Sequence, residues 1–391
     1  MICFDNAATS WPKPLEVKEA MVKFMEEIGA NPGRSGHHLS IEAARIIYET
    51  REALSVCFNV RDPSRIVFTL NATESINLAL KGLLKPGTHV ITSSMEHNSV
   101  MRPLRDLEEK GVALSIVPCS EVGSLDPQDV ERKIQLNTRM IILNHASNVI
   151  GTLLPIGEVG RIARKHNLLF LVDAAQTAGA FPIDLEKQKI DLLAFTGHKS
   201  LYGPQGTGGL VIGERVKEKE MTPLKQGGTG SRSEFEEQPD FLPDRFESGT
   251  PNGVGIAGLL AGVQFVLKKG IEQIRQHEIG LIQKLIKGLK EIPRVKLYSP
   301  ENSADRIATL SFNIRELSPS DVAFRLEKEF GILCRPGLHC APSAHRTIGT
   351  FPEGTVRFGL SFFNVEEETQ AAIEAVSRIS QQQESFPPVQ K

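Results

Sequence analysis

The chain has 391 residues, a length typical of two domains, and its formal net charge of -2 excludes a global positive field that would attract nucleic acid or an anionic membrane. Five cysteines at irregular spacing argue against a secreted disulfide framework, and no stretch reaches the ~20 apolar residues of a membrane span. We therefore expect a cytoplasmic protein that acts on a small molecule, without nucleic-acid or membrane partners.

The first two thirds of the chain alternate short apolar runs with helical stretches. The apolar runs predict seven strands: Ile66–Leu70, His89–Ser93, Leu114–Pro118, Met140–Asn144, Leu168–Val172, Leu192–Thr196 and Leu210–Gly213. Most are separated by predicted helices: Glu74–Leu84, Asn98–Lys110, Pro127–Gln135 and Ile156–His166. This alternation indicates an α/β fold, with helices on both faces of a mostly parallel seven-stranded sheet.

The pattern changes after Pro251, which predicts a second, smaller domain of α+β order. Its predicted helices are Ile256–Lys269, Ile271–Leu289, Pro319–Phe330 and Glu366–Ile379. Its predicted strands are Lys296–Ser299, Thr309–Ile314, Ile332–Arg335 and Val356–Leu360. We expect residues 15–250 to form the large domain, residues 1–14 and 251–379 the small domain, and residues 380–391 a disordered tail. The glycine-rich, charged stretch Gln226–Pro243 predicts a mobile surface loop between them.

A lysine and a carboxylate follow two of the predicted strands. Lys199 lies just past Leu192–Thr196, and Asp173 directly follows Leu168–Val172. Ligands bind at the carboxyl edge of an open α/β sheet, so both side chains should face one crevice. Alone, Asp173 would more often be a helix N-cap and Lys199 a surface cation. Their pairing favours pyridoxal phosphate, which needs a lysine for its Schiff base and a carboxylate on its ring nitrogen.

Two further motifs reach the same edge. Asn71-Ala72-Thr73-Glu74-Ser75 opens a helix, whose N–H groups and dipole favour an anion such as the cofactor phosphate, and Thr73 would add its hydroxyl. His97 follows His89–Ser93, and there an imidazole can stack on the ring and relay protons. A histidine that starts a helix and is satisfied by its neighbours is an equally good interpretation of His97.

Seven motifs, in order and nearly spanning the chain, resemble those of the class V aminotransferase family. They are Asp5-Asn6-Ala7-Ala8-Thr9, Asn71-Ala72-Thr73-Glu74-Ser75-Ile76-Asn77, Glu96-His97-Asn98, Ser147-Asn148-Val149-Ile150-Gly151-Thr152, Asp173-Ala174-Ala175-Gln176, Thr196-Gly197-His198-Lys199 and Phe246-Glu247-Ser248-Gly249-Thr250-Pro251-Asn252. The resemblance implies a fold-type I pyridoxal-phosphate enzyme, usually a homodimer.

The resemblance also implies which residues bind the cofactor. They are Thr73, Glu74, His97, Asp173, Gln176, Thr196, His198 and Lys199, with Thr250 reaching the partner subunit's phosphate. In this set Thr73, Thr196 and His198 hold the phosphate, and Gln176 contacts the ring oxygen.

Arg335-Pro336-Gly337-Leu338-His339-Cys340-Ala341 resembles the Arg-x-Gly-x-His-Cys-Ala loop of cysteine desulfurases, in the branch that includes selenocysteine lyases. It departs at Leu338, where the best-known members often carry a second histidine. Cys340 has His339 and Arg335 as cationic or polarisable neighbours that favour a thiolate, whereas Cys334 lies in an apolar run and should be buried.

The reaction implied by this resemblance releases alanine from L-cysteine or selenocysteine. Lys199 removes the Cα proton, His97 relays protons, and the Cys340 thiolate takes the sulfur as a persulfide, which a partner protein could accept. Arg357 matches the family's carboxylate-binding arginine, with Asn148 assisting. Arg335 either contacts substrate or only shapes the loop.

Three alternatives compete with this interpretation. The glycine-rich run Gly203–Gly209 suggests nucleotide binding, but it precedes a predicted strand instead of following one. A zinc site would use Cys334, His339, Cys340 and His345, whose spacing is not that of C-x2-4-C pairs, so we expect no metal. Within the enzyme class, the alternative is an aminotransferase or β-lyase that does not use Cys340 as nucleophile.

Overall fold

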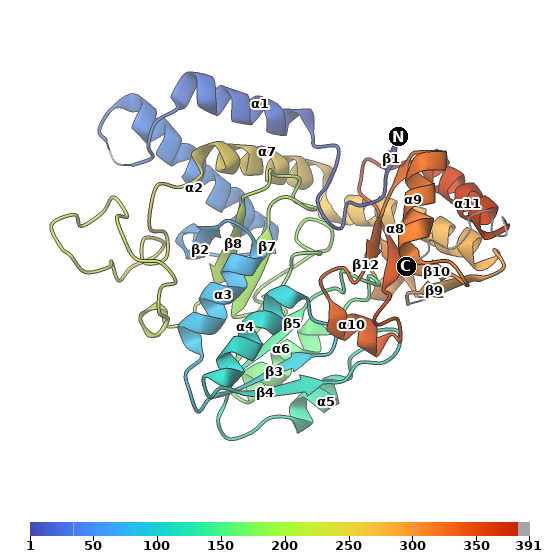
Figure 1. The fold of residues 1–391 in the computed structure, drawn as a ribbon. Helices are drawn as coiled ribbons and strands as arrows, with labels where there is room; N and C mark the ends of the chain where they lie inside the picture. The colour runs from blue at the N-terminus through green and yellow to red at the C-terminus, as the bar shows by residue number, and fades with distance from the viewer. Residues whose placement is uncertain (34, 301, 382–391) are drawn as a thin grey trace, which may run out of the picture.

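The computed structural model of the protein describes residues 1–33, 35–300 and 302–381. A large α/β unit built on a seven-stranded sheet lies beside a smaller unit built on a four-stranded sheet (Figure 1). Residues 380 and 381, predicted to begin a disordered tail, instead end the last helix, α11 (Glu366–Gln381). The rest of the predicted tail lies outside the described residues.

The large sheet has the strand order β2-β8-β7-β6-β5-β3-β4. Its strands are β2 (Ile66–Thr69), β3 (His89–Ser93), β4 (Ala113–Val117), β5 (Thr138–Asn144), β6 (Leu169–Asp173), β7 (Leu192–Thr196) and β8 (Gly208–Ile212). All neighbours pair in parallel except β8, which is antiparallel to both β2 and β7. The predicted mostly parallel seven-stranded sheet is confirmed.

Apolar side chains point to both faces of this sheet, which is why helices cover both. Ile141 and Leu143 of β5 belong to one core cluster, and Met140 and Ile142 belong to the other. The first face packs against α2 (His38–Phe58), α5 (Pro127–Arg132), α6 (Ile156–Lys165) and α7 (Gly253–Lys269). The second face packs against α3 (Ala72–Leu83) and α4 (Asn98–Glu109).

Two helices that the sequence analysis did not predict lie along α7. They are α1 (Leu15–Lys23), which continues as a π-helical turn over Phe24–Ile28, and α2 (Figure 1). Phe24 packs so closely on Gly253 that a Cβ there would lie 2.5 Å from the phenyl ring. These contacts fasten α1 and α2 to a helix that packs on the large sheet.

The smaller unit has an antiparallel sheet in the order β12-β13-β10-β9. Its elements are α8 (Ile271–Lys290), β9 (Val295–Tyr298), β10 (Thr309–Ile314), α9 (Pro319–Phe330), β12 (Arg335–Gly337), α10 (Pro342–Thr347), β13 (Thr355–Gly359) and α11. The N-terminal strand β1 (Ile2–Cys3) pairs in parallel with β11 (Ile332–Leu333), and Phe4 packs into the core of this unit. Both ends of the described chain therefore contribute to the small unit.

The predicted single strand Ile332–Arg335 is wrong. The chain forms β11 beside β1 and then, past Cys334, enters the other sheet as β12 beside β13. Cys334, expected to be buried, is half-buried, and desolvation raises its pKa to about 12. The change of sheet carries Arg335 toward the large unit.

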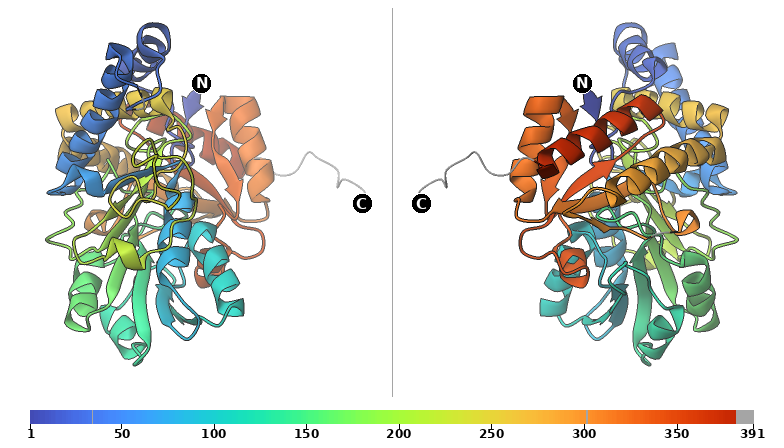
Figure 2. Two further views of the ribbon diagram at one scale, coloured as in Figure 1. Left: turned by 90° about the vertical axis from the view of Figure 1, so that its left-hand side faces the viewer. Right: turned by 90° about the vertical axis from the view of Figure 1, so that its right-hand side faces the viewer.

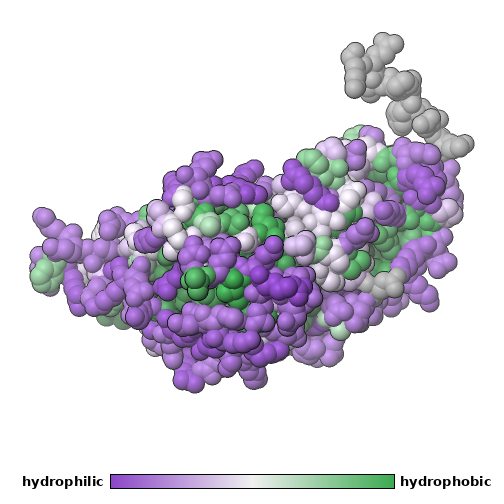
Figure 3. All heavy atoms as spheres, turned by 90° about the horizontal axis from the view of Figure 1, so that it is seen from below, coloured by the Kyte–Doolittle hydropathy of each residue, from purple (hydrophilic) through white to green (hydrophobic). Residues whose placement is uncertain are grey.

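Helices α8, α9 and α11 cover the outer face of the small sheet (Figure 2). The inner face contacts the large unit, because Ser311 Oγ donates to the carbonyl of Val149 at 2.7 Å and Arg357 Nη1 to that of Asn148 at 3.0 Å. On the face shown in Figure 3, hydrophilic residues form most of the surface and apolar residues lie in groups between them. Among the described helices, no single one passes the length and hydropathy test for a membrane span; only the pair α7 and α8, bent by 80°, passes it together.

Candidate active site

A cavity of about 270 Å³ opens at the carboxyl edge of the large sheet, where the small unit faces it. The ends of β5, β6 and β7 supply Asn144, Asp173 and Thr196 to its wall. Ten predicted site residues line it: Thr73, His97, Asn148, Asp173, Gln176, Thr196, His198, Lys199, Arg335 and Arg357. The cavity therefore joins residues that are up to 350 positions apart in the chain, from Ala7 to Arg357 (357 − 7).

Lys199 and Asp173 both have altered proton affinity. Burial lowers the pKa of Lys199 to about 8; Asp173 opposes this shift, and Arg357 and Arg335 add to it. Burial also raises the pKa of Asp173. The N–H of Ala175, which donates to Oδ1 at 2.9 Å, and the charge of Lys199 both oppose this shift. An amine that loses its proton near pH 8 is available as a nucleophile and a base.

The N-terminus of α3 points to the cavity. Asn71 caps this helix by accepting the N–H of Glu74 at 3.0 Å, which leaves the first-turn N–H groups of Ala72 and Thr73 without intrahelical partners. The hydroxyl of Thr73 lies 2.7 Å from that of Ser99, another residue of the cavity wall. Donors at a helix N-terminus bind a phosphate or carboxylate group well.

Six buried polar atoms around this cavity have no hydrogen-bond partner among the described residues. They are Asn144 Oδ1, Asn148 Oδ1, Thr196 Oγ1, His198 Nδ1, His339 Nδ1 and Arg357 Nε. Buried polar groups are normally satisfied, because an unpaired one costs about 1–3 kcal/mol. Their gathering around one cavity indicates that a polar ligand belongs there.

His97 both starts α4 and lines the cavity, so the two interpretations of this residue are compatible. Its Nδ1 accepts the N–H of Ser99 at 3.0 Å, which puts the proton of the neutral ring on Nε2. Burial, with smaller effects from Lys199, Arg335 and other cations, lowers the pKa of His97 to about 4. The ring is therefore neutral at physiological pH.

Arg335 and Arg357 lie directly opposite each other on the neighbouring strands β12 and β13, and both line the cavity. Like charges in that position destabilise a sheet, so the pair indicates an anionic ligand. The side chain of Arg357 is 1% exposed; it forms a 2.8 Å ion pair with Asp5 and donates to the carbonyl of Asn148. Asp5 lies in the first of the seven motifs, but the sequence analysis gave it no role.

Cys340 lies in the turn between β12 and α10 and is exposed. Its Sγ is 3.5 Å from Nη2 of Arg335, so the thiol lies beside the cavity that Arg335 lines. His339, however, is not a cationic neighbour of the thiol: its ring is buried, Nε2 lies 3.1 Å from Oγ1 of Thr355, and burial lowers the pKa of His339 to about 2. Of the two residues expected as cationic neighbours of the thiol, only Arg335 is one.

Glu74 is not at the cavity, which corrects its prediction as a cofactor contact. Its carboxylate accepts the N–H of Leu70 at 2.6 Å and pairs with Lys225 at 2.7 Å, so it completes the cap of α3. Glu74 and the exposed Thr250 line a separate, smaller cavity of about 100 Å³. Thr250 therefore does not line the larger cavity.

Sequence analysis also missed Ser99, Asn144 and Lys13. Ser99 and Asn144 lie in the cavity wall, and the ammonium of Lys13 donates to the carbonyl of His198 at 2.8 Å. Ser99 follows the motif Glu96-His97-Asn98, and Asn144 ends a predicted strand. Both could therefore have been predicted from their positions near the carboxyl edge of the sheet.

The glycine-rich run Gly203–Gly209 has a packing role. It leads into β8, whose first two residues are Gly208 and Gly209, and a Cβ on Gly208 would lie 2.7 Å from Cα of Asn71. No group of three or more His, Cys, Asp or Glu side chains among residues 1–33, 35–300 and 302–381 could hold a metal ion.

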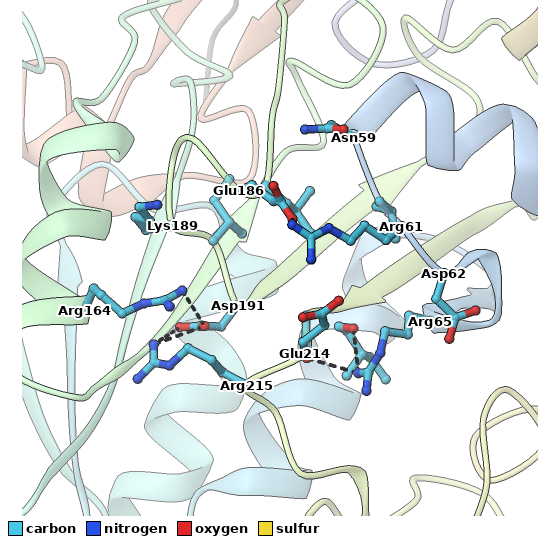
Figure 4. Close-up of a pocket in the computed structure, with 15 residues that line it drawn as sticks. Asn59, Arg61, Asp62, Arg65, Arg164, Glu186, Lys189, Asp191, Glu214 and Arg215 are labelled. Carbon is cyan, nitrogen blue, oxygen red and sulfur yellow. Dashed lines mark hydrogen bonds and ion pairs between the residues drawn. The ribbon is translucent and has the colours of Figure 1, made fainter.

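A second cavity, of about 330 Å³, lies at the opposite edge of the large sheet (Figure 4). Asp191, just before β7, binds Arg215 at 3.0 Å and lies 3.7 Å from Arg164. Arg61 pairs with Glu186 at 2.7 Å, and Arg65 donates to main-chain carbonyls at the end of β8. Four of its five cations are therefore held by protein acceptors, and the network ties the strand ends together instead of converging on a ligand.

The sheet, the small unit and the strand-end cavity with its lysine and acid define a fold-type I protein of the pyridoxal-phosphate-dependent class. Residues 2–372 match the model of the family described as aminotransferase class-V, and the chain belongs to this family. A probable cysteine desulfurase of Methanothermobacter thermautotrophicus is 35% identical over 381 residues, which cover 96% of this chain and 94% of the relative. A cysteine desulfurase of Escherichia coli is 32% identical over 387 residues, with 97% and 93% covered.

Solved structures agree with this assignment. The apo structure of a cysteine desulfurase from Thermococcus onnurineus matches with a TM-score of 0.90 and 34% identity, covering 97% of this chain and 94% of that one. The cysteine desulfurase CsdA from Escherichia coli matches with a TM-score of 0.85 and 28% identity, covering 96% and 94%.

Proposed function

We propose that the protein is a pyridoxal-phosphate-dependent cysteine desulfurase, which converts L-cysteine to L-alanine and takes the sulfur as a persulfide on Cys340. One observation carries this proposal: the sulfur of Cys340 contacts Arg335, which lines the same cavity as Lys199 and Asp173. The names of its full-length relatives support the same activity.

The residues of the cavity fit pyridoxal phosphate. Thr196 Oγ1 and His198 Nδ1, both buried without partners among the described residues, would hold the phosphate together with Thr73 and the first-turn N–H groups of α3. Asp173 would bind the ring nitrogen, and Gln176 the ring oxygen. When bound, the cofactor supplies an electron sink that stabilises negative charge at the substrate Cα.

Lys199 and His97 handle protons in this proposal. Lys199, whose pKa of about 8 leaves part of it neutral at physiological pH, holds the cofactor and then accepts the Cα proton of the substrate. His97 carries its proton on Nε2, because Nδ1 is occupied by the N–H of Ser99, so Nε2 is the atom that passes a proton on.

Arg357 binds the substrate carboxylate, since its guanidinium is buried and Nε has no partner among the described residues. Asn148 assists by orienting the guanidinium, because its backbone carbonyl accepts Nη1 of Arg357 at 3.0 Å. The carboxylate takes the place that Asp5 holds beside Arg357. Arg335 is left to act on the thiol.

Cys340 is the nucleophile. Its Sγ lies 3.5 Å from Nη2 of Arg335, and its thiolate attacks the substrate sulfur. A sulfur–sulfur bond forms as the substrate Cβ–S bond breaks, and the electron pair stays with the carbon fragment, which is protonated to alanine.

Several partners follow as parts of the proposal. Selenocysteine has the same groups with selenium in place of sulfur, so the same residues would bind it.

A homodimer would let Thr250 reach the phosphate of the partner subunit. An acceptor protein would take the sulfur from Cys340, which is exposed. A reducing, cytoplasmic setting would suit the five free cysteines.

Cys340→Ala and Lys199→Ala test the proposal against an aminotransferase or β-lyase. We expect Cys340→Ala to keep the visible absorbance of the bound cofactor and to lose sulfide release from L-cysteine, whereas Lys199→Ala should lose that absorbance as well. Cys334→Ala, a cysteine in the same segment, is the matched control. Undiminished sulfide release by Cys340→Ala would contradict the proposed nucleophile.

A further inference from the structure

The turn that carries Cys340 has an unusual backbone. His339 and Cys340 have φ values of 48° and 57°, so two consecutive non-glycine residues adopt the left-handed conformation. Side chains disfavour this region, and it persists only where the surroundings determine it. The turn is closed by its own hydrogen bond, from the N–H of Ala341 to the carbonyl of Leu338 at 2.8 Å, and contacts from outside the turn add to it.

Two hydrogen bonds from the large unit hold the carbonyls of these two residues. The side-chain amide of Asn148 donates to the carbonyl of His339 at 2.7 Å, and the backbone N–H of Asn98 donates to that of Cys340 at 2.8 Å. Asn98 is the first residue of α4, where an N–H has no intrahelical acceptor and is free for this contact. Both bonds cross from the large unit to the small unit at the rim of the cavity.

Each donor is linked to a residue that faces the cavity. Asn98 directly follows His97, which caps α4 and lines the cavity. The carbonyl of Asn148 accepts Nη1 of Arg357 at 3.0 Å. The turn is thus bonded to the large unit at two points. One is next to His97, which lines the cavity, and the other is Asn148, which also binds Arg357.

We propose that Asn98, through its backbone N–H, and Asn148, through its side chain, are positioning residues for Cys340. They hold the His339–Cys340 turn in its left-handed form and so keep the sulfur beside Arg335 and the cavity. The inference rests on the proposed function only in taking Cys340 as the nucleophile.

Proline at residue 98 removes the donor with little cost to the helix. Proline is favoured at the first position of a helix, and the residue before it must be extended. His97 already has φ −73° and ψ 157°, which meets that requirement. Asn98→Pro therefore removes the N–H that binds Cys340, whereas Asn98→Ala keeps it and is the matched control.

The experiment uses the holoenzyme and three readouts: cofactor absorbance, alkylation of Cys340 by iodoacetamide at pH 7 followed by peptide mass spectrometry, and the separate kcat and KM for L-cysteine. For Asn98→Pro we expect unchanged absorbance, a KM within about twofold, a kcat lowered about tenfold to a hundredfold, and a changed alkylation rate. Asn98→Ala should match the wild type in all three. Equal alkylation rates and equal kcat in the two variants would overturn the inference.

Asn148→Ala provides a second test if the proline variant fails to bind cofactor. Because Asn148 is also proposed to touch substrate, its decisive readout is alkylation in the absence of substrate, which should change relative to the wild type. An unchanged rate would count against the inference. If the wild type forms no persulfide, the proposed function fails, but the alkylation comparisons still decide whether these two residues position the thiol.

Discussion

Arg357, which lines the cavity, and Asp5 form a 2.8 Å ion pair that joins strand β13 to the N-terminal segment. The arginine side chain is 1% exposed and the aspartate side chain 33%, so the anion is the partner that solvent or a ligand can reach. We expect a substrate carboxylate to replace Asp5 beside Arg357, and until then Asp5 keeps the buried charge paired.

Asp5→Asn should lower the stability of the unliganded protein and strengthen substrate binding. Loss of the carboxylate leaves the guanidinium of Arg357 without its counter-charge, which should cost about 1–3 kcal/mol of unfolding free energy. The same change removes the competitor for the substrate carboxylate, so KM for L-cysteine should fall severalfold. Chemical denaturation and steady-state kinetics check the two effects. A higher KM in Asp5→Asn would show that the aspartate assists binding instead.

The pH dependence of cofactor uptake reports on Lys199. Burial lowers its pKa from 10.5 to about 8, so the neutral amine, which is the reactive form, becomes abundant as pH rises through about 8. The rate at which the cofactor-free protein gains visible absorbance with added pyridoxal phosphate should rise over that range and level off above it. A rate that continues to rise toward pH 10 would mean that the cavity does not perturb this lysine. Lys199→Arg is the control for uptake elsewhere.

Glu278 should make the folded protein less stable as pH rises. Burial raises its pKa from 4.5 to about 8, so the folded state binds more protons than the unfolded state between these values, and stability falls by up to about 1.4 kcal/mol per pH unit across that window. Glu278→Gln lacks this loss, so its stability relative to the wild type should rise from pH 5 to pH 8 in denaturation experiments. Glu272→Gln, exposed on the same helix, is the matched control. A difference between Glu278→Gln and the wild type that does not change with pH would contradict the expected shift.

Apolar periodicity predicted the large sheet, because strands buried on both faces are nearly continuous apolar runs. The predicted strands also placed Asp173 and Lys199 at one site, because the carboxyl ends of parallel strands lie at the same edge of a sheet. The strand break at Cys334 could not be predicted, because nothing within Ile332–Arg335 shows that its first half pairs with β1 and its second half with β13.

Side-chain direction was the part of the site that sequence proximity misjudged. His339 is adjacent to Cys340, yet the left-handed turn sends its ring inward to Thr355 while the thiol meets Arg335. Glu74 follows Thr73, yet it turns back to cap α3 and bind Lys225. Asp5 is 352 residues from its partner Arg357, so only the fold could reveal that pair.

The central claim is that Cys340 receives the sulfur of the substrate. The most direct measurement is peptide mass spectrometry of the holoenzyme after a single turnover with L-cysteine, without reductant or acceptor. The account predicts a mass increase of one sulfur atom on the peptide that contains Cys340, matched by one equivalent of alanine, and no such increase at Cys334. Alanine formed in that amount with an unmodified Cys340 would contradict it.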